Sequence, residues 1–317
     1  MWLNIIFLLG GLFLLQRGAA WFVNGSSSLA RKFQISELTI GLTIVAFGTS
    51  APELVVNSFA ASSDNHEIVF GNIIGSNIFN LFVILSIIGL IQPMKVQSST
   101  AWKEIPFSFL ALLLLFLITN DQLILHKTKS QLGLIDGIIL LIAFAFFLFY
   151  AFRHLKTDAI HVEDTKNPDK NYKIILLVVF GLTGLVVGGK LVVDHAVIIA
   201  MEIGMSEKLV GLLIIAPGTS LPELATSIVA MIKKNNDIAV GNIIGSNIFN
   251  VLFILPISAF IKPLTYNTDF NFDMIFLAIG TIILFMAMYT GKKKQIDRWE
   301  AFVLLGCYIG YMVWMLK

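Results

Sequence analysis

Long apolar stretches separated by short polar interruptions dominate the chain. Each stretch is close to the roughly 20 residues that an α-helix needs to cross about 30 Å of hydrocarbon. A transmembrane β-barrel would instead show alternating segments of about ten residues. The pattern therefore predicts an all-α polytopic membrane protein with ten transmembrane helices, at about residues 2–24, 38–62, 66–91, 104–120, 131–152, 173–200, 207–231, 237–261, 271–290 and 297–316.

Two sequence segments occur twice. The decapeptide GNIIGSNIFN stands at residues 71–80 and again at 241–250, and GLTIVAFGTSAPEL (41–54) aligns with GLLIIAPGTSLPEL (211–224). A single shift of 170 residues superimposes both pairs. Because each half has an odd number of spans, the second half enters the membrane from the opposite side, as in secondary transporters with inverted repeats. We expect a first repeat of five helices at residues 1–152, a cytoplasmic linker at 153–172 and a second, inverted repeat at 173–317.

Composition and charge agree with a membrane protein and indicate its orientation. Hydrophobic residues make up 57% of the chain and charged residues only 13%, well below the roughly 25% of a soluble domain. A net charge of +2 gives no reason to expect a nucleic-acid partner. The excess of Lys and Arg on one side predicts that both termini lie outside the cell membrane (inner or plasma membrane). The loops thereby assigned to the cytoplasm carry Arg31, Lys32, Lys95, Lys103, Arg153, Lys156, Lys166, Lys170, Lys173, Lys233, Lys234, Lys292, Lys293, Lys294 and Arg298.

Prolines predict a break in one helix of each half. Pro52 and Pro222 cannot donate to the carbonyls four residues earlier, at Gly48 and Gly218, and a glycine weakens the helix further. A carbonyl released at membrane depth must be buried in protein or face a hydrated cavity. A bound cation is a suitable partner for such a carbonyl.

A carboxylate stands beside each predicted break. Glu53 and Glu223 lie in otherwise apolar spans, where a charge costs at least about 2.5–3.5 kcal/mol. Hydroxyl residues accompany each of them at helical spacing, Thr49 and Ser50 in the first half and Thr219 and Ser220 in the second. Any one of these hydroxyls, taken alone, could simply bond to the preceding turn.

The decapeptide adds a polar stripe to each half. In the first copy Asn72, Ser76 and Asn80 recur every four residues and share one helical face. Gly71 and Gly75 form a small-xxx-small pair, from which we expect close approach of the glutamate-bearing helix. Carboxylates, hydroxyls, amide oxygens and released carbonyls together form an all-oxygen set, which suits a hard cation such as calcium. The five histidines do not pair at metal-ligand spacing, so a soft-metal site or another cofactor is not expected.

At these residues the chain resembles the prokaryotic type of sodium/calcium exchanger within the calcium/cation antiporter superfamily. The resemblance covers nearly the whole chain and rests on one copy per half of both G-T-S-x-P-E and G-N-x-x-G-S-N. It implies a ten-helix fold and exchange of sodium for calcium, with no cofactor besides the transported ions. The ligands it implies are the side chains of Glu53, Glu223, Thr49, Thr219, Ser50, Ser220, Ser76, Ser246, Asn80 and Asn250, and the carbonyls of Ala46 and Ala216.

Asn250 departs from many microbial relatives of that family, which have Asp at this position. With two carboxylates, the site is formally neutral when it holds one calcium or two sodium ions. A third sodium ion would make the loaded carrier positive, so the departure bears on ion affinity and coupling ratio. We expect alternating access, because two uncompensated carboxylates in a closed low-dielectric site would oppose crossing of the empty carrier.

The sequence alone leaves the counter-ion open, whereas it argues against nucleotide-dependent and hydrolytic functions. A proton/calcium (or other divalent cation) antiporter would use the same scaffold, and a cation channel is a more distant alternative. Gly184–Lys190 matches G-x4-G-K, but Leu191 replaces the Ser or Thr that binds magnesium, so no nucleotide site is expected. No hydrolase motif indicates an enzyme, and the sequence leaves the oligomeric state open.

Overall fold

The computed structural model describes residues 2–33, 35–120, 130–154, 171–202, 216–290 and 294–315. Nearly all of its regular structure is helical, with π-helical turns labelled η. By contacts the chain divides into two compact units, Met1–Pro52 with Tyr150–Asn242 and Glu53–Phe149 with Ile243–Lys317. Each unit therefore contains segments from both halves of the sequence.

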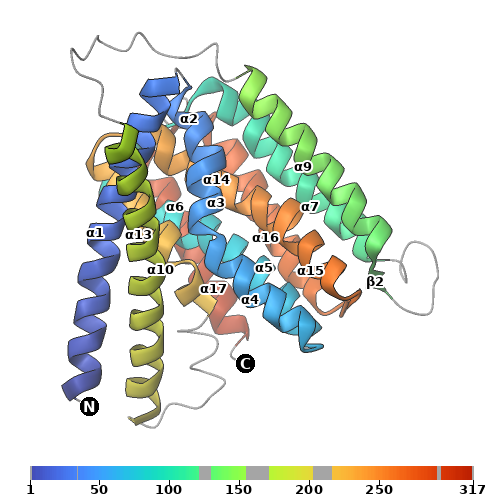
Figure 1. Cartoon of the computed structure of the whole chain (residues 1–317). Helices are drawn as coiled ribbons and strands as arrows, with labels where there is room; N and C mark the ends of the chain where they lie inside the picture. Colours follow the sequence, from blue (N-terminus) through green and yellow to red (C-terminus); the bar gives the residue numbers. More distant parts are fainter. Residues whose placement is uncertain are drawn as a thin grey trace. The chain divides into compact units, whose positions relative to one another are not determined.

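The first unit is built on α1 (Trp2–Phe33) and α10 (Asn171–Glu202), which lie side by side over much of their length (Figure 1). Glycines allow this approach: a Cβ on Gly18 would lie 2.7 Å from the backbone nitrogen of Leu185, and one on Gly181 would lie 2.5 Å from that of Phe22. Small residues commonly permit such close helix packing in membranes. The unit also contains the elements around the first predicted break and those around the second: α2 (Glu37–Ile40), η1 (Gly41–Val45), α3 (Ala46–Thr49), α12 (Ala216–Thr219) and α13 (Leu221–Ile232).

The second unit surrounds two long helices that carry the decapeptide copies. The first runs through α5 (His66–Phe79), η2 (Asn80–Ile84) and α6 (Leu85–Ile91), and the second through α14 (Asn236–Phe249, from Ile243 onward in this unit), η5 (Asn250–Ile254) and α15 (Leu255–Ile261). Their most apolar windows are 78% and 83% buried, against 28–33% for the other candidate spans. The repeated decapeptides thus lie in the two most buried of the candidate spans among the described residues.

The remaining elements of the second unit pack around these helices. They are α4 (Ala51–Ser62), η3 (Thr100–Glu104), α7 (Ile105–Thr119), α9 (Leu134–His154), α16 (Phe270–Ala287) and α17 (Arg298–Met315). The rings of Phe107 and Phe147 stack at 5.2 Å between α7 and α9, which lie alongside one another in Figure 1. Phe144 on α9 meets Phe249 on α14 edge to face at 4.8 Å.

Two short antiparallel pairs join loops of the second unit. Strand β1 (Met94–Lys95) pairs with β4 (Gln295–Ile296), with Met94 opposite Ile296. Strand β2 (Gln131–Leu132) pairs with β3 (Leu264–Thr265), with Leu132 opposite Leu264. The positive-inside rule assigned both loops of the first pair to the cytoplasm and both loops of the second pair to the outside. The pairings are consistent with that alternation.

Within the described residues, seven helices are long and apolar enough to cross a membrane, and α2–α4 form an eighth candidate when counted as one broken span. This makes the chain a multi-pass helical membrane protein. The count does not reach the expected ten. At the expected seventh span, α13 is too short by itself and residues 203–215 before α12 lie outside the described ranges, and the expected tenth span, α17, is not among the candidates. The ten-helix arrangement therefore stays a prediction.

Candidate cation site

The first broken helix is interrupted at Ser50, where the backbone leaves helical geometry with φ −83° and ψ 7°. The helical segments on either side are bent by 46°. Pro52 is in the first turn of the next helix, α4, where its missing N–H removes no helical hydrogen bond. The second half repeats the arrangement, because Ser220 has φ −90° and ψ 10° between α12 and α13, with Pro222 in the first turn of α13. The predicted breaks are confirmed, and each falls at a serine.

Ser50 and Glu223 connect the two halves of the sequence inside the first unit. The Oγ of Ser50 donates to Oε1 of Glu223 at 2.8 Å, and the two residues are 2% and 1% exposed. Both come from a GTS-x-PE segment, one from each half, 173 residues apart. A hydroxyl that donates to a carboxylate keeps both of its acceptor lone pairs, so the two side chains together supply two kinds of oxygen that can ligate a cation.

Thr49 and Asn242 extend this polar group. The Thr49 hydroxyl lies 2.9 Å from Oδ1 of Asn242 and 3.3 Å from the carbonyl of Ala46. The Nδ2 of Asn242 in turn donates to Oγ of Ser227 at 3.0 Å and to the backbone carbonyl of Glu223 at 3.3 Å. Asn242 therefore fixes both the threonine of one half and the backbone at the glutamate of the other.

The second unit contains a bond equivalent to the one between Asn242 and Ser227. Asn72 donates from Nδ2 to Oδ1 of Asn57 at 3.3 Å, and both positions correspond to Asn242 and Ser227 after the shift of 170 residues. Asn57 and Ser227 were not singled out by sequence, although the repeat register could have paired them with the neighbouring asparagines. The two copies thus share equivalent hydrogen bonds as well as a similar sequence.

Four asparagines form a crossed amide cluster at the end of the two decapeptides. Asn80 donates from Nδ2 to Oδ1 of Asn247 at 3.1 Å, and Asn250 donates from Nδ2 to Oδ1 of Asn77 at 2.9 Å. Asn77 and Asn247 also donate to each other's backbone carbonyls, at 3.2 and 3.5 Å. Asn77 and Asn247 stand in the copied decapeptide but off its polar stripe, so the sequence pattern did not single them out.

This cluster determines which atoms of Asn80 and Asn250 are available. Each uses an amide nitrogen for the crossed bond, and each Oδ1 is buried with no hydrogen-bond partner among the described residues. The same holds for Oγ of Ser76. Buried acceptors without partners are uncommon in folded proteins, and one explanation is an ion that is bound in the working protein.

The other predicted ligands are placed as follows. Glu53 lies in the first turn of α4 in the second unit and is 1% exposed. Ser246 and Ser220 are fully buried, and Thr219 is partly buried. The carbonyl of Ala46 accepts bonds from the Ser50 backbone N–H and the Thr49 hydroxyl, so it is directed into the break. The side chain of Ala216 lies outside the described residues, and its backbone begins α12.

One expectation about the glycines is wrong within the described ranges. A Cβ on Gly75 would meet no atom within 4 Å, and one on Gly71 would meet only the ring of Phe270, at 3.7 Å. The close approach occurs at another glycine, Gly241, where a Cβ would lie 2.9 Å from the backbone of Leu38 and Leu42. The helix that leads to the first break, rather than the glutamate helix itself, is the element in contact there.

One family profile matches nearly the whole chain. The profile of the family described as sodium/calcium exchanger protein matches residues 3–153 and 173–317. The chain belongs to the sodium/calcium exchanger family. Members of this family are membrane transporters, so the protein is a cation/calcium antiporter by family and not an enzyme in the catalytic sense.

Individual proteins align with nearly the whole length of the chain. A putative antiporter, CaxA of Alkalimonas amylolytica, is 38% identical over 96% of both chains. The sodium/calcium exchanger MaX1 of Methanosarcina acetivorans is 31% identical, covering 98% of this chain and 97% of its own. The solved structure of the sodium-calcium exchanger NCX_Mj superimposes with a TM-score of 0.82 at 32% identity, over 98% of both chains.

Proposed function

We propose that the protein exchanges sodium for calcium by alternating access at a midplane site with two glutamates. The observation that carries the proposal is the bond from Ser50 to Glu223, which joins the broken helices of both sequence halves through buried oxygens. The proposed ligands are the side chains of Glu53, Glu223, Thr49, Thr219, Ser50, Ser220, Ser76, Ser246, Asn80 and Asn250 and the carbonyls of Ala46 and Ala216.

The chemistry of the donor set supports a hard cation. Every proposed ligand atom is oxygen, and calcium takes six to eight oxygens in flexible geometry. The carboxylate of Glu223 accepts a hydrogen bond from a neutral donor, the hydroxyl of Ser50. A cation bound beside a buried carboxylate compensates its charge.

Charge balance supports coupled exchange. One calcium or two sodium ions neutralise two carboxylates, whereas the empty site retains two buried negative charges. Closing an empty site would cost several kcal/mol per ion in a low-dielectric interior. Crossing is then favoured only with ions bound, and the sodium gradient can drive calcium in the opposite direction.

The wider arrangement is proposed on the same basis. Ten spans in two inverted repeats of five, 1–152 and 173–317, with a cytoplasmic linker at 153–172, would place both termini outside the cell membrane. The two crossed bonds, Asn80 to Asn247 and Asn250 to Asn77, are equivalent to each other under the shift of 170 residues, which supports the duplication. The named function of MaX1 and the sodium, strontium and calcium soaks of NCX_Mj support sodium and calcium as the ions.

A transport assay tests the proposal directly. Purified protein in sodium-loaded liposomes should accumulate radioactive calcium after dilution into sodium-free buffer. Glu53→Gln or Glu223→Gln should abolish this uptake, because each removes one of the two charges that neutralise calcium. Glu300→Gln is the matched control, since Glu300 in the first turn of α17 is also buried at 4% exposure but accepts hydrogen bonds from Thr290 and from the backbone N–H of Asp297.

The outcomes separate the function from the site. Calcium uptake that ignores sodium loading and follows a pH gradient would replace the sodium/calcium assignment with proton/calcium antiport. Calcium uptake at wild-type rates in both Glu53→Gln and Glu223→Gln would show that the proposed two-glutamate site is wrong. The proposal requires sodium dependence in the wild type and in Glu300→Gln together with loss in both site variants.

A further inference from the structure

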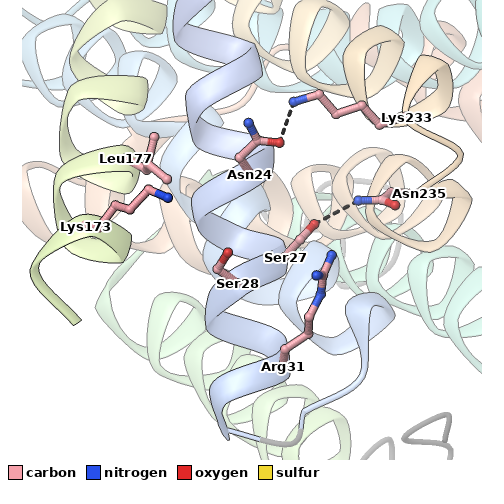
Figure 2. A pocket seen from close by; sticks show the side chains of 8 residues that line it. All are labelled: Asn24, Ser27, Ser28, Arg31, Lys173, Leu177, Lys233 and Asn235. Atoms are coloured by element: carbon pink, nitrogen blue, oxygen red, sulfur yellow. Dashed lines mark hydrogen bonds between the residues drawn. The ribbon is translucent and has the colours of Figure 1, made fainter. Parts of the chain in front are cut away.

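A polar pocket in the first unit lies away from the proposed ligands. Its volume is about 450 Å³, within the usual range for small-molecule sites. The pocket lies between the C-terminal part of α1, the first turns of α10 and the turn that follows α13 (Figure 2). It is lined by Asn24, Ser27, Ser28, Arg31, Lys173, Leu177, Lys233 and Asn235.

The lining is strongly biased in charge. Arg31, Lys173 and Lys233 are cationic, and no acidic residue is among the eight lining residues. Among the described residues, the carboxylate of Glu37 at the start of α2 interacts electrostatically with Arg31. The lining itself therefore carries three positive charges and no negative one.

Hydrogen bonds fix the walls of the pocket. Lys233 donates from Nζ to Oδ1 of Asn24 at 2.6 Å and to the carbonyl of Ala20 at 2.9 Å, and Asn235 donates to the hydroxyl of Ser27 at 2.8 Å (Figure 2). An ammonium carries three donors, so Lys233 keeps one for a ligand. These hydrogen bonds join α1 to the turn after α13, so the walls of the pocket are held in place before any ligand binds.

We propose that this pocket binds a phosphate group, and that in the membrane the group belongs to the headgroup of an anionic phospholipid. Guanidinium, ammonium and hydroxyl donors around one cavity are the groups that recognise phosphate oxygens. All three cations are on the side that the positive-inside rule assigns to the cytoplasm, where basic pockets between membrane helices take anionic headgroups.

The surroundings favour a lipid over a free anion. Leu177 lines the pocket itself, and the same stretch of α10 exposes Tyr172, Ile175 and Leu176, which are 62%, 60% and 45% exposed. Exposed apolar side chains beside a cationic pocket provide a surface for acyl chains. A bound lipid would then hold α1 and α10 against the turn after α13.

Binding can be measured by thermal unfolding of the full-length purified protein in a neutral detergent. The probes are a short-chain phosphatidylglycerol, the equivalent phosphatidylcholine and inorganic phosphate. Phosphatidylglycerol should raise the unfolding temperature in a saturable way, whereas phosphatidylcholine should not. Arg31→Gln should raise the phosphatidylglycerol concentration at the midpoint of the titration by roughly tenfold, which is the effect of losing one charge-assisted contact with phosphate.

Lys32→Gln is the matched control, because Lys32 adjoins Arg31 on α1 but does not line the pocket and instead lies over the ring of Phe33 at 5.2 Å. Its titration should match the wild type. Arg31→Lys, which keeps the charge, should recover part of the affinity if Arg31→Gln is poorly folded. If inorganic phosphate stabilises the protein with the same midpoint concentration as phosphatidylglycerol, the phosphate site is supported but its ligand is a soluble anion and the lipid assignment is wrong. Equal titrations of Arg31→Gln and Lys32→Gln, or no stabilisation by either anion, would overturn the proposal.

Discussion

At the residue scale, amide orientation is the feature that most limits the proposed site. An asparagine side chain presents a donor on one side and an acceptor on the other, so it can serve a cation only if its oxygen faces the ion. Asn77 and Asn247 accept the amide protons of Asn250 and Asn80, and this leaves Oδ1 of the latter pair without a described partner. We infer that Asn77 and Asn247 orient the proposed ligands Asn250 and Asn80 without touching the ion themselves.

Asn77→Ala tests this positioning role. Loss of the acceptor for Asn250 should raise the apparent KM for calcium by roughly three- to tenfold, the effect of one neutral hydrogen bond, with a smaller change in maximal rate. Asn120→Ala is the control, because Asn120 exchanges two side-chain hydrogen bonds with Asn271, at 3.0 and 2.7 Å, and neither residue is a proposed ligand. A purely structural role for Asn77 would lower the unfolding temperature of both variants and leave both KM values unchanged.

At the element scale, interruptions of regular helix coincide with the proposed ligands. The broken helices are interrupted at Ser50 and Ser220, and a π-helical turn begins at Asn80 and another at Asn250. Both kinds of interruption change the backbone bonding pattern, and π-bulges are frequent at functional sites. The proline after each serine break makes a continuous helix unfavourable there, so the break does not depend on a bound ion.

Pro52→Ala should therefore weaken transport without weakening the fold. The new N–H at position 52 can bond the carbonyl of Gly48, which favours a continuous helix and moves Ser50 away from Glu223. We expect calcium uptake to fall by roughly tenfold, consistent with loss of a hydrogen bond to a charged group, and the unfolding temperature to stay level or rise. Pro106→Ala, at the same position in the first turn of α7, should leave uptake unchanged. Equal calcium uptake by Pro52→Ala and Pro106→Ala would show that transport does not require the proline at the helix break.

At the scale of the whole molecule, α1 and α10 are packed as a pair. Glycines at positions 11, 18 and 25 of α1 all approach α10 closely, and Gly181 and Gly188 approach α1 in the same way. Interfaces this tight at glycine backbones cannot slide without steric clash. If α1 and α10 are the elements that move during alternating access, we expect them to move together.

A crosslink tests whether the pair moves as one body. An ideal Cβ at position 11 lies 3.0 Å from Cβ of Leu191, close to the roughly 3.5–4.5 Å of a disulfide. In a background of Cys307→Ser, which removes the one native cysteine, Gly11→Cys with Leu191→Cys should oxidise to a crosslinked protein that still exchanges calcium. Gly10→Cys with Leu191→Cys should not crosslink, because a Cβ at position 10 meets no atom within 4 Å. Uptake that stops on oxidation and returns on reduction would show that α1 and α10 must slide.

The sequence by itself determined the class of the protein, the breaks and the burial of the copied motif. Hydrophobic length and proline position act locally, through the thickness of the membrane and the absence of one N–H, so they can be read residue by residue. The 170-residue register likewise identified the glutamates and their hydroxyl neighbours before any coordinates. The number of spans, the convergence of the two glutamates and the direction of transport stay predictions.

Only the tertiary structure decided which side chains meet. The bond from Ser50 to Glu223, the crossed amides of Asn77 and Asn247 and the contact at Gly241 instead of Gly75 join residues far apart in the chain. A helical pattern states which residues share a face, but the partner of that face depends on how separate helices cross and rotate, which is a property of packing. The cationic pocket depends on such crossings as well, because its three charges come from three different parts of the sequence.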